Sequence, residues 1–403
     1  MNMKVLIVNK FLYPNGGSET YIFKTGEELQ KKGHEVQYFG MEHTNRIVGN
    51  HAECYTTNMD FHTNKLTKVL YPFKIIYSAE ARKKIGIVLR DFRPDVVHLN
   101  NFNFQLTPSI LYEVRKYERE EKKRVKIIYT AHDSQLVCPD HLMQQYLTQE
   151  RCDRCVTGSP WNCAKNKCIH GSLSKSIIGS LEAWIYRTLK AYRMIDVIIC
   201  PSDFLKKQLD HCREIAGKTL VMHNFIDIPD SKEEKKDDRK YVLYFGRYSK
   251  EKGMETLLQV CQGLPEIPFV FAGNGPLEEK VNDVDNIENK GFQSGEKLYS
   301  LIRNAQFTIF PSECNENCPF SVMESIAEGI PVIGSDIGGV PELISDGQNG
   351  FLVAPGNAEE LKSKISCLWN DDDKLKSMKN NCKNTKYDSL SEYCDKLVEL
   401  YQK

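Results

Sequence analysis

Two glutamates in the second half of the chain could bind hydroxyl groups. Glu316 lies in a loop after the apolar segment 307–310, and Glu324 lies inside a helix that we expect to begin near Pro319. Seven residues separate the two carboxylates, so both can point into one cleft at different depths and accept hydrogen bonds from sugar or ribose hydroxyls. Glutamates are mostly solvent-exposed. The pair alone therefore leaves open that Glu324 is an ordinary solvated helix residue.

Two cations lie upstream, just before another expected helix. Arg247 and Lys252 follow the apolar segment 241–245 and the turn residue Gly246. A planar guanidinium and a flexible ammonium together suit a diphosphate. A further glycine turn, Gly338-Gly339, follows the apolar segment 331–334. Three loops at strand ends are therefore expected to converge on one anionic ligand.

The elements that position these loops are short apolar strands alternating with helical segments. The expected strands of the first half are 5–8, 35–39, 96–99, 126–130 and 197–200, and those of the second half are 241–245, 269–272, 307–310, 331–334 and 350–353. Repeated strand–helix units predict parallel, doubly wound sheets, and such sheets bind ligands beyond the carboxyl ends of their strands. The sequence predicts two such α/β domains facing a central cleft, which are residues 1–225 and 241–385, with a polar linker at 226–240.

Composition places the chain among folded globular proteins. It has 403 residues with 41% hydrophobic and 27% charged side chains, and its 54 basic residues balance its 54 acidic ones, so nucleic acid is not an expected partner. Residues 1–225 carry 33 basic and 23 acidic side chains, which suits the first half to anionic surfaces or ligands. No apolar run approaches the roughly 18 residues of a membrane span, and we expect a cytoplasmic location.

Taken together, these motifs resemble glycosyltransferase family 4, whose members are retaining enzymes of the GT-B fold with two Rossmann-like domains. The resemblance implies that Arg247 and Lys252 hold the donor diphosphate, that Glu324 binds the ribose and that Glu316 contacts the transferred sugar. It also implies a histidine beside that sugar, His132, and a helix, 386–403, that crosses back to the first domain. The remaining donor-side positions that it implies are Gly16, Gly17, Gly246, Gly273, Asn274, Phe292, Asn317, Cys318, Pro319 and Phe320.

What the family does implies the chemistry expected here. Its members transfer a sugar from a UDP-, GDP- or ADP-sugar to a saccharide or lipid-linked hydroxyl acceptor, with no catalytic metal. Cations then stabilise the leaving diphosphate. Bacterial surface polysaccharide, such as capsule, exopolysaccharide or lipopolysaccharide, is the expected product. Two alternatives stay open, which are an epimerase-like enzyme acting on a nucleotide sugar and a GT-B binding module without catalytic activity.

A cysteine-rich insert occupies about residues 138–170. Cys152, Cys155, Cys163 and Cys168 have the spacing C-x2-C-x7-C-x4-C, and four thiolates could close a tetrahedral structural zinc site. Unligated thiols are the alternative, and disulfides fit a cytoplasmic chain least well. Cys138, His141 and His170 could substitute as ligands.

A helix over 177–192 follows this insert. Ile178, Leu181, Ile185 and Leu189 recur at helical spacing among aromatic and basic residues. Packing in a core is the ordinary explanation. The alternative is an interfacial helix that, with the basic first half, brings the enzyme to the anionic inner face of the plasma membrane as a peripheral protein.

Overall fold

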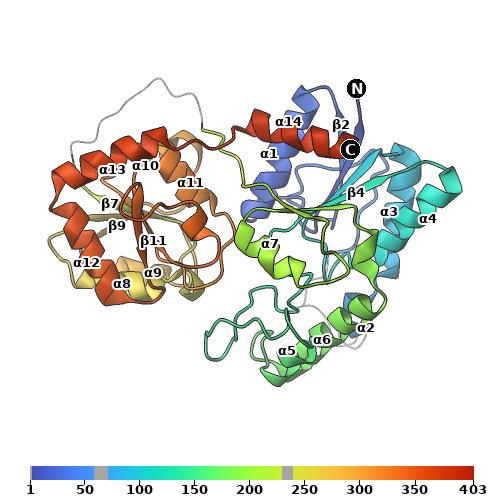
Figure 1. The fold of residues 1–403 in the computed structure, drawn as a ribbon, viewed down its shortest axis with the longest axis horizontal. Helices are drawn as coiled ribbons and strands as arrows, with labels where there is room; N and C mark the ends of the chain where they lie inside the picture. The colour runs from blue at the N-terminus through green and yellow to red at the C-terminus, as the bar shows by residue number, and fades with distance from the viewer. Residues whose placement is uncertain (1, 59–70, 229–238) are drawn as a thin grey trace. The chain divides into compact units, whose positions relative to one another are not determined.

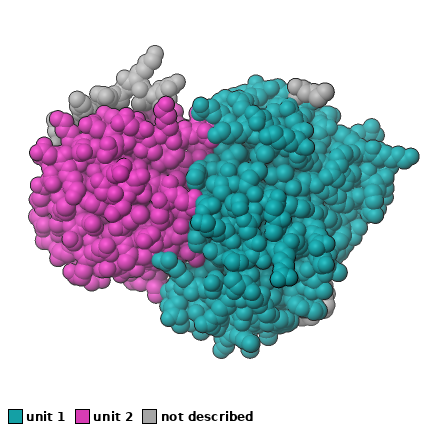
Figure 2. Space-filling model, viewed as in Figure 1, with its two compact units in different colours: residues 1–223, 390–403 teal, residues 224–389 magenta. Residues whose placement is uncertain are grey.

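The structure is a computed structural model that describes residues 2–58, 71–228 and 239–403. It divides into two compact units, which Figure 2 shows in different colours. Unit 1 comprises residues 1–223 and 390–403, and unit 2 comprises residues 224–389. Most of the predicted linker, residues 229–238, lies outside the described residues.

Unit 1 is built on a six-stranded parallel sheet (Figure 1). Its order is β2-β1-β3-β4-β5-β6, so β1 lies between β2 and β3, with Val8 aligned to Phe39 on one side and to Leu99 on the other. Its strands are mainly apolar and buried, apart from the partly exposed edge strand β6, as expected where helices cover both faces of a parallel sheet. Their bounds are β1 (Lys4–Val8), β2 (Glu35–Phe39), β3 (Val96–Leu99), β4 (Lys126–Thr130), β5 (Val197–Cys200) and β6 (Thr219–Val221).

Unit 2 holds a second six-stranded parallel sheet, in the order β12-β11-β10-β7-β8-β9. Alternate residues of β7 enter different apolar clusters, Val242 and Tyr244 on one face and Leu243 and Phe245 on the other, so this strand is buried on both sides. The strand bounds are β7 (Val242–Phe245), β8 (Phe269–Ala272), β9 (Ile287–Asn289), β10 (Thr308–Phe310), β11 (Val332–Ser335) and β12 (Gly350–Val353). Both units therefore have the doubly wound α/β architecture that the sequence predicts.

Helices connect the strands in both units. Those of unit 1 are α1 (Gly17–Lys31), α2 (Tyr71–Ile76), α3 (Ala79–Phe92), α4 (Ser109–Glu121), α5 (Trp161–Lys165), α6 (Leu173–Thr188), η2 (Ala191–Met194) and α7 (Asp203–Asp210). Those of unit 2 are η3 (Lys250–Lys252), α8 (Met254–Gln262), α9 (Glu278–Asn282), α10 (Gly295–Asn304), α11 (Phe320–Ala327), η4 (Val340–Glu342), α12 (Ala358–Trp369) and α13 (Asp372–Asn384). None of the helices in the described part of the chain combines the length and apolar character that a membrane-crossing helix needs.

The last helix, α14 (Leu390–Gln402), belongs to unit 1 and packs against α1. Its Tyr393 hydroxyl hydrogen-bonds to that of Tyr21 at 3.0 Å, and the hydroxyl of Tyr401 lies 2.7 Å from Nδ1 of His98. His98 in turn contacts Thr130 of β4, 2.8 Å away, and burial lowers the pKa of His98 to about 3. A neutral, buried hydrogen-bond network thus joins this helix to the strands of unit 1.

The helix expected over 177–192 forms, but its apolar side chains do not pack as expected. It appears as α6 followed by η2, and Ile177, Trp184 and Leu189 are exposed. Of the four side chains that the spacing identified, Leu189 is 60% exposed and Ile178, Leu181 and Ile185 are partly buried, so the prediction of packing in a core is wrong for Leu189. The physical reason is that the side of α6 that faces the protein carries mainly small and polar side chains, which are Ser176, Gly179, Ser180, Glu182 and Ala183, together with the aromatic Tyr186.

Candidate active site

The chemistry-bearing loops of unit 2 meet where the strand order reverses. β7 lies between β8 and β10. After β7 the chain adds β8 and β9 on one side of this strand, and it then returns to add β10, β11 and β12 on the other side. Loops at such a switch point leave a crevice beyond the carboxyl ends of the strands, where ligands of doubly wound sheets bind. The loop after β7 carries Arg247 and Lys252, and the loop after β10 carries Glu316.

Lys252 and Glu316 form an ion pair across these two loops, although 64 residues separate them. The Ser312 hydroxyl donates a second hydrogen bond to the same carboxylate oxygen, at 2.7 Å. Burial by itself lowers the pKa of Lys252, but the Glu316 carboxylate, together with Cys314 and Glu251, outweighs this effect and raises the pKa above its ordinary value. Lys252 therefore stays charged in a partly buried position.

Backbone contacts fix the loop that carries Glu316. The Glu251 carbonyl oxygen accepts hydrogen bonds from the amides of Glu313 and Cys314, at 3.0 and 3.2 Å, and the Glu316 carbonyl oxygen accepts one from Gly339 at 2.7 Å. Gly338 has φ +58°, and a Cβ there would overlap the backbone of Glu316. Glycine is required at this position because the loop after β11 approaches so closely. The loop after β10 thus touches both of the other predicted loops.

Arg247 differs from Lys252 in having no charged partner in the part of the chain that the structure describes. Its side chain is exposed and forms no ion pair with any residue that the structure describes, while its carbonyl oxygen accepts a 2.8 Å hydrogen bond from the Tyr244 hydroxyl. The loop after β8 lies against this turn, because a Cβ at Gly273 would overlap the carbonyl oxygen of Gly246. The neighbouring Asn274 is exposed. An anchored backbone thus presents an unpaired guanidinium at the strand ends.

Glu324 and the segment before it lie on or near α11. The Tyr299 hydroxyl donates to the Glu324 carboxylate at 3.2 Å. Pro319 caps α11, which begins at Phe320, and the Asn224 side chain holds the Cys318 carbonyl oxygen at 2.8 Å. Asn317 and Phe320 are partly exposed, so the first turn of this helix, whose amides lack partners within the helix, is accessible. Phe292, the predicted contact of the base, is 70% exposed.

In unit 1, α1 begins at the predicted glycine turn, with Gly16 as its N-cap and Gly17 as its first residue, both exposed. The neighbouring Glu19 is buried, which was not predicted from the sequence. Its carboxylate accepts hydrogen bonds from Asn9 at 2.9 Å and from Ser18 at 3.0 Å. This carboxylate therefore holds the loop after β1 in place.

His132 follows β4 and stays neutral. Its Nε2 lies 2.8 Å from Oδ1 of Asn100, the residue directly after β3, and its ring meets that of Tyr21 edge to face at 5.0 Å. Burial lowers the pKa of His132 to about 4. An imidazole in this environment can donate or accept a hydrogen bond at neutral pH but carries no charge. Asn100 was not singled out from the sequence, although its place after a predicted strand could have identified it.

The cysteine-rich insert brings three of the four predicted cysteines together. Cys155, Cys163 and Cys168 form a small buried cluster, and Cys152 is partly buried. A hydrogen bond from the Cys163 thiol holds the pKa of Cys168 below its ordinary value. Within the described ranges, no three His, Cys, Asp or Glu side chains are placed to hold a metal ion. Zinc binding by Cys152, Cys155, Cys163 and Cys168 stays a prediction for metal analysis of the purified protein.

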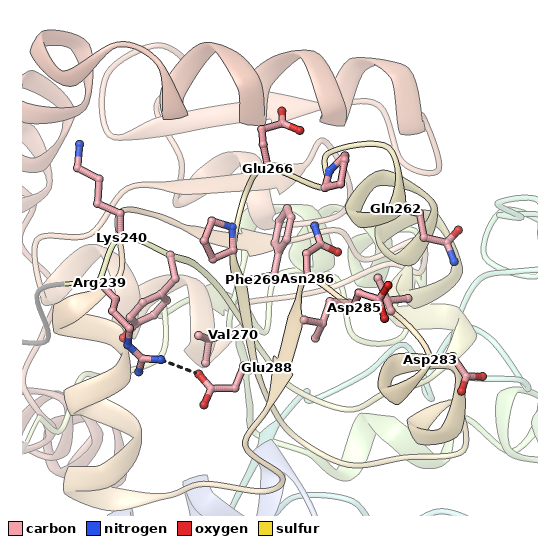
Figure 3. Close-up of a pocket in the computed structure, with 15 residues that line it drawn as sticks. Arg239, Lys240, Gln262, Glu266, Phe269, Val270, Asp283, Asp285, Asn286 and Glu288 are labelled. Carbon is pink, nitrogen blue, oxygen red and sulfur yellow. Dashed lines mark hydrogen bonds and ion pairs between the residues drawn. The ribbon is translucent and has the colours of Figure 1, made fainter.

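A pocket of about 1080 Å³ lies at the other edge of the unit 2 sheet. Figure 3 shows its lining, with Arg239 paired to Glu288 and with Phe269 and Asn286 at the starts of β8 and β9. These residues precede the strands or lie in their first residues, whereas Arg247, Lys252 and Glu316 follow the strands. The pocket is therefore separate from the candidate site.

Comparison with known families gives the identity of the chain. Residues 15–229 match the family model described as Glycosyltransferase Family 4, and residues 226–385 match the model described as Glycosyl transferases group 1. The chain belongs to glycosyltransferase family 4. The two matches meet at 226–229, next to the boundary between the two compact units of this family 4 protein.

Curated relatives are also glycosyltransferases. The uncharacterized glycosyltransferase MJ1607 of Methanocaldococcus jannaschii is 29% identical over 96% of this chain and 95% of its own length. A second protein of that organism, the uncharacterized glycosyltransferase MJ1178, is 29% identical over 53% of this chain, and the match spans 61% of its length. The putative colanic acid biosynthesis glycosyltransferase WcaL of Salmonella typhimurium is 28% identical over 31% of this chain and 35% of its own length.

Solved structures share the fold over the whole chain. Sucrose-phosphate synthase from Thermosynechococcus elongatus has a TM-score of 0.73 at 16% identity, covering 100% of this chain and 98% of that one. HepE from Anabaena, in complex with UDP, has a TM-score of 0.67 at 16% identity, covering 99% and 100%. The fold of this family 4 glycosyltransferase is accordingly GT-B.

Proposed function

We propose that this glycosyltransferase moves a sugar from a nucleotide-sugar donor to a hydroxyl acceptor and retains the anomeric configuration. The observation that carries the proposal is the ion pair between Lys252 and Glu316 at the switch point of the unit 2 sheet, with the unpaired Arg247 on the same loop as the lysine. A paired lysine and a free guanidinium beside a carboxylate suit a ligand that joins a diphosphate to a sugar.

Each of these side chains has a role that its chemistry supports. Arg247 and Lys252 bind the diphosphate and stabilise its charge as the bond between its oxygen and the anomeric carbon breaks. The acceptor oxygen then forms its bond to the same face of that carbon, and its proton passes to a phosphate oxygen. Glu316 positions the sugar and favours the positive charge that develops on it. Double displacement is the alternative route to retention.

Other residues bind the rest of the donor. Glu324 accepts hydrogen bonds from the ribose, and the first turn of α11, from Asn317 to Phe320, donates amides to the sugar. Phe292 lies beside the base in this proposal, whereas Gly273 and Asn274 belong to the loop on the nucleotide side. In unit 1, neutral His132 hydrogen-bonds to the transferred sugar, and the α1 amides at Gly16 and Gly17 face phosphate or acceptor.

UDP-sugars are the first donors to test, because HepE and similar structures were solved with UDP or UDP-glucose. GDP- and ADP-sugars are the other candidates. We propose that the transferred sugar is a hexosyl group and that the acceptor is a hydroxyl group of a saccharide or of a lipid-linked molecule. We place the reaction in bacterial surface polysaccharide synthesis, in line with the similarity to WcaL, and propose a peripheral position at the cytoplasmic face of the membrane.

Donor binding and donor hydrolysis test this function together. Thermal unfolding is measured with UDP-, GDP- and ADP-glucose, because a ligand bound only by the folded state raises the melting temperature. We expect one base to raise it, and we expect proton NMR to show that the first glucose released from the α-linked donor is the α-anomer. Early release of the β-anomer would overturn retention, and a donor that binds without any hydrolysis would favour the binding module.

A further inference from the structure

Helix α6 exposes large apolar side chains on one side. Five of its six buried residues are small or polar, with Ser176 and Ser180 fully buried, whereas the sixth, Tyr186, packs in the core of unit 1. Its exposed side includes large apolar side chains, with Leu173 50%, Ile177 40% and Trp184 47% exposed. A helix on a globular protein normally turns its apolar stripe inward. The apolar side of α6 therefore requires another explanation.

Hydrogen bonds show that the serine side of α6 is the side that the fold uses. The Ser180 hydroxyl donates to the Pro160 carbonyl oxygen at 3.0 Å and accepts from the Ala164 amide at 3.1 Å. The Ser176 hydroxyl accepts from the Ile169 amide at 3.0 Å. These bonds attach α6 to α5 and to the loop between them, which leaves the opposite side facing outward. In Figure 1, α5, α6 and α2 lie together at the lower end of unit 1.

The loop before α5 extends the apolar side of α6. Tyr146 is 49% and Leu147 66% exposed, and a Cβ at Gly171, just before α6, would lie 3.2 Å from Tyr146 and 3.5 Å from Leu147. We call Tyr146, Leu147, Leu173, Ile177 and Trp184 the α6 surface. Eight of the thirteen large apolar side chains that are exposed among the described residues lie within 142–189. Such concentration on one segment marks a contact site.

Basic residues accompany the α6 surface. Residues 142–190 contain seven Lys or Arg and three acidic residues, of which Glu182 is buried. Four exposed ammonium groups in this segment form no ion pair with any described residue, and they belong to Lys165, Lys167, Lys175 and Lys190. Cations free of partners in the same segment as exposed apolar and aromatic side chains are the features of a region that inserts shallowly into an anionic bilayer.

We propose that the α6 surface docks on an anionic lipid bilayer. Trp184 and Tyr146 sit at the level of the headgroups, Leu147, Leu173 and Ile177 enter the acyl boundary, and the lysines meet lipid phosphates. A protein partner fits less well, because protein interfaces are depleted in lysine. A second copy also fits less well, since a twofold contact would bring the same lysines together. This docking does not depend on the proposed sugar transfer.

Vesicle sedimentation tests the proposal with the full chain. Vesicles contain phosphatidylcholine with about 30 mol% phosphatidylglycerol, or phosphatidylcholine alone. We expect binding to the anionic vesicles at low salt, weaker binding at physiological salt, and a loss of at least roughly tenfold in the partition coefficient for the double variant Ile177→Ser, Trp184→Ser. The matched control is Ile87→Ser, because Ile87 is 45% exposed on α3, away from α6, and should leave binding unchanged.

Several results decide against the proposal. Absence of sedimentation with anionic vesicles at low salt overturns it, and so does a double variant that binds as well as the wild-type protein. A dimer in light scattering that the double variant abolishes, without vesicle binding, would assign the α6 surface to a second copy instead. Circular dichroism melting checks that the variants fold. Donor-induced thermal shifts of the same variants keep this outcome separate from the proposed function, because they should remain unchanged.

Discussion

The carboxyl edge of the unit 2 sheet and the α6 region of unit 1 differ in how they accommodate an acidic side chain. Glu316 is partly exposed, with the Lys252 ammonium and the Ser312 hydroxyl on its carboxylate. Glu182 of α6 is 3% exposed, and its Oε1 has no hydrogen-bond partner among the described residues. Burial raises the pKa of Glu182 to about 8, and the charge of Arg187 offsets this only in part.

The two regions therefore differ in the charge state of their acidic side chains. The carboxyl edge of the unit 2 sheet keeps Glu316 charged beside Lys252, whereas burial in α6 favours the neutral form of Glu182. At the unit 2 edge, opposite charges are kept together where strands end and water is near, so they are available to an ionic ligand. In α6, the acid is buried, and the apolar side chains of Leu173, Ile177 and Trp184 are exposed. Each arrangement departs from ordinary packing, and each departure indicates a different contact, with a charged small molecule in the first case and with a lipid surface in the second.

Removing either member of the ion pair should have the largest effect. We expect Lys252→Ala and Glu316→Ala each to lower sugar transfer at least about a hundredfold while the fold stays intact, because each removes charge that the transition state needs. The matched control is Lys250→Ala, since Lys250 lies exposed in the same short helix η3 and should retain most activity. Near-normal turnover of either variant would show that the Lys252–Glu316 pair is not needed for transfer, and the proposed difference in role between the two regions would be lost.

Replacing the buried acid should have a smaller effect, on stability and not on transfer. A glutamate with a raised pKa keeps its proton in the folded chain between about pH 4.5 and 8, while the unfolded chain has released it. Its stabilising contribution is complete below pH 4.5 and is lost as the pH rises to 8. We expect Glu182→Gln to remove this loss and to raise the unfolding free energy at pH 8, relative to wild type, by about 2 to 4 kcal/mol.

Urea unfolding at pH 5 and pH 8 measures this change, with the exposed Glu121→Gln as the control. The result that counts against a neutral Glu182 is a difference between variant and wild type that stays the same at both pH values.

Much of the fold could be predicted from the sequence, because interior strands of parallel sheets are nearly continuous apolar runs. β3 and β12 have the predicted bounds. β6 and β9 were not predicted, and both are three-residue strands at sheet edges, whose partly exposed side chains give no apolar run. Spacing also predicted a helix near α6, but periodicity does not tell which side of a helix faces the protein.

The site was predictable where residue type and position both carried chemistry. Lys252 and Glu316 were named from the sequence, and the structure brings them together. Ser312 and Tyr299, which bond to Glu316 and Glu324, were not named, because a hydroxyl group reveals its partner only after folding. Gly338 was noticed as a turn, but its role against the Glu316 backbone depends on a contact between two distant loops.

The central claim is that Arg247 and Lys252 hold the diphosphate of a nucleotide at the carboxyl edge of the unit 2 sheet. Calorimetric titration of UDP, GDP and ADP into the wild-type protein and into Arg247→Ala and Lys252→Ala tests it most directly. The account predicts that at least one of these diphosphates binds and that each substitution weakens its affinity roughly tenfold or more, as the loss of a charge-assisted contact should. Equal affinity in all three proteins, or no binding of any diphosphate to the wild type, would contradict it.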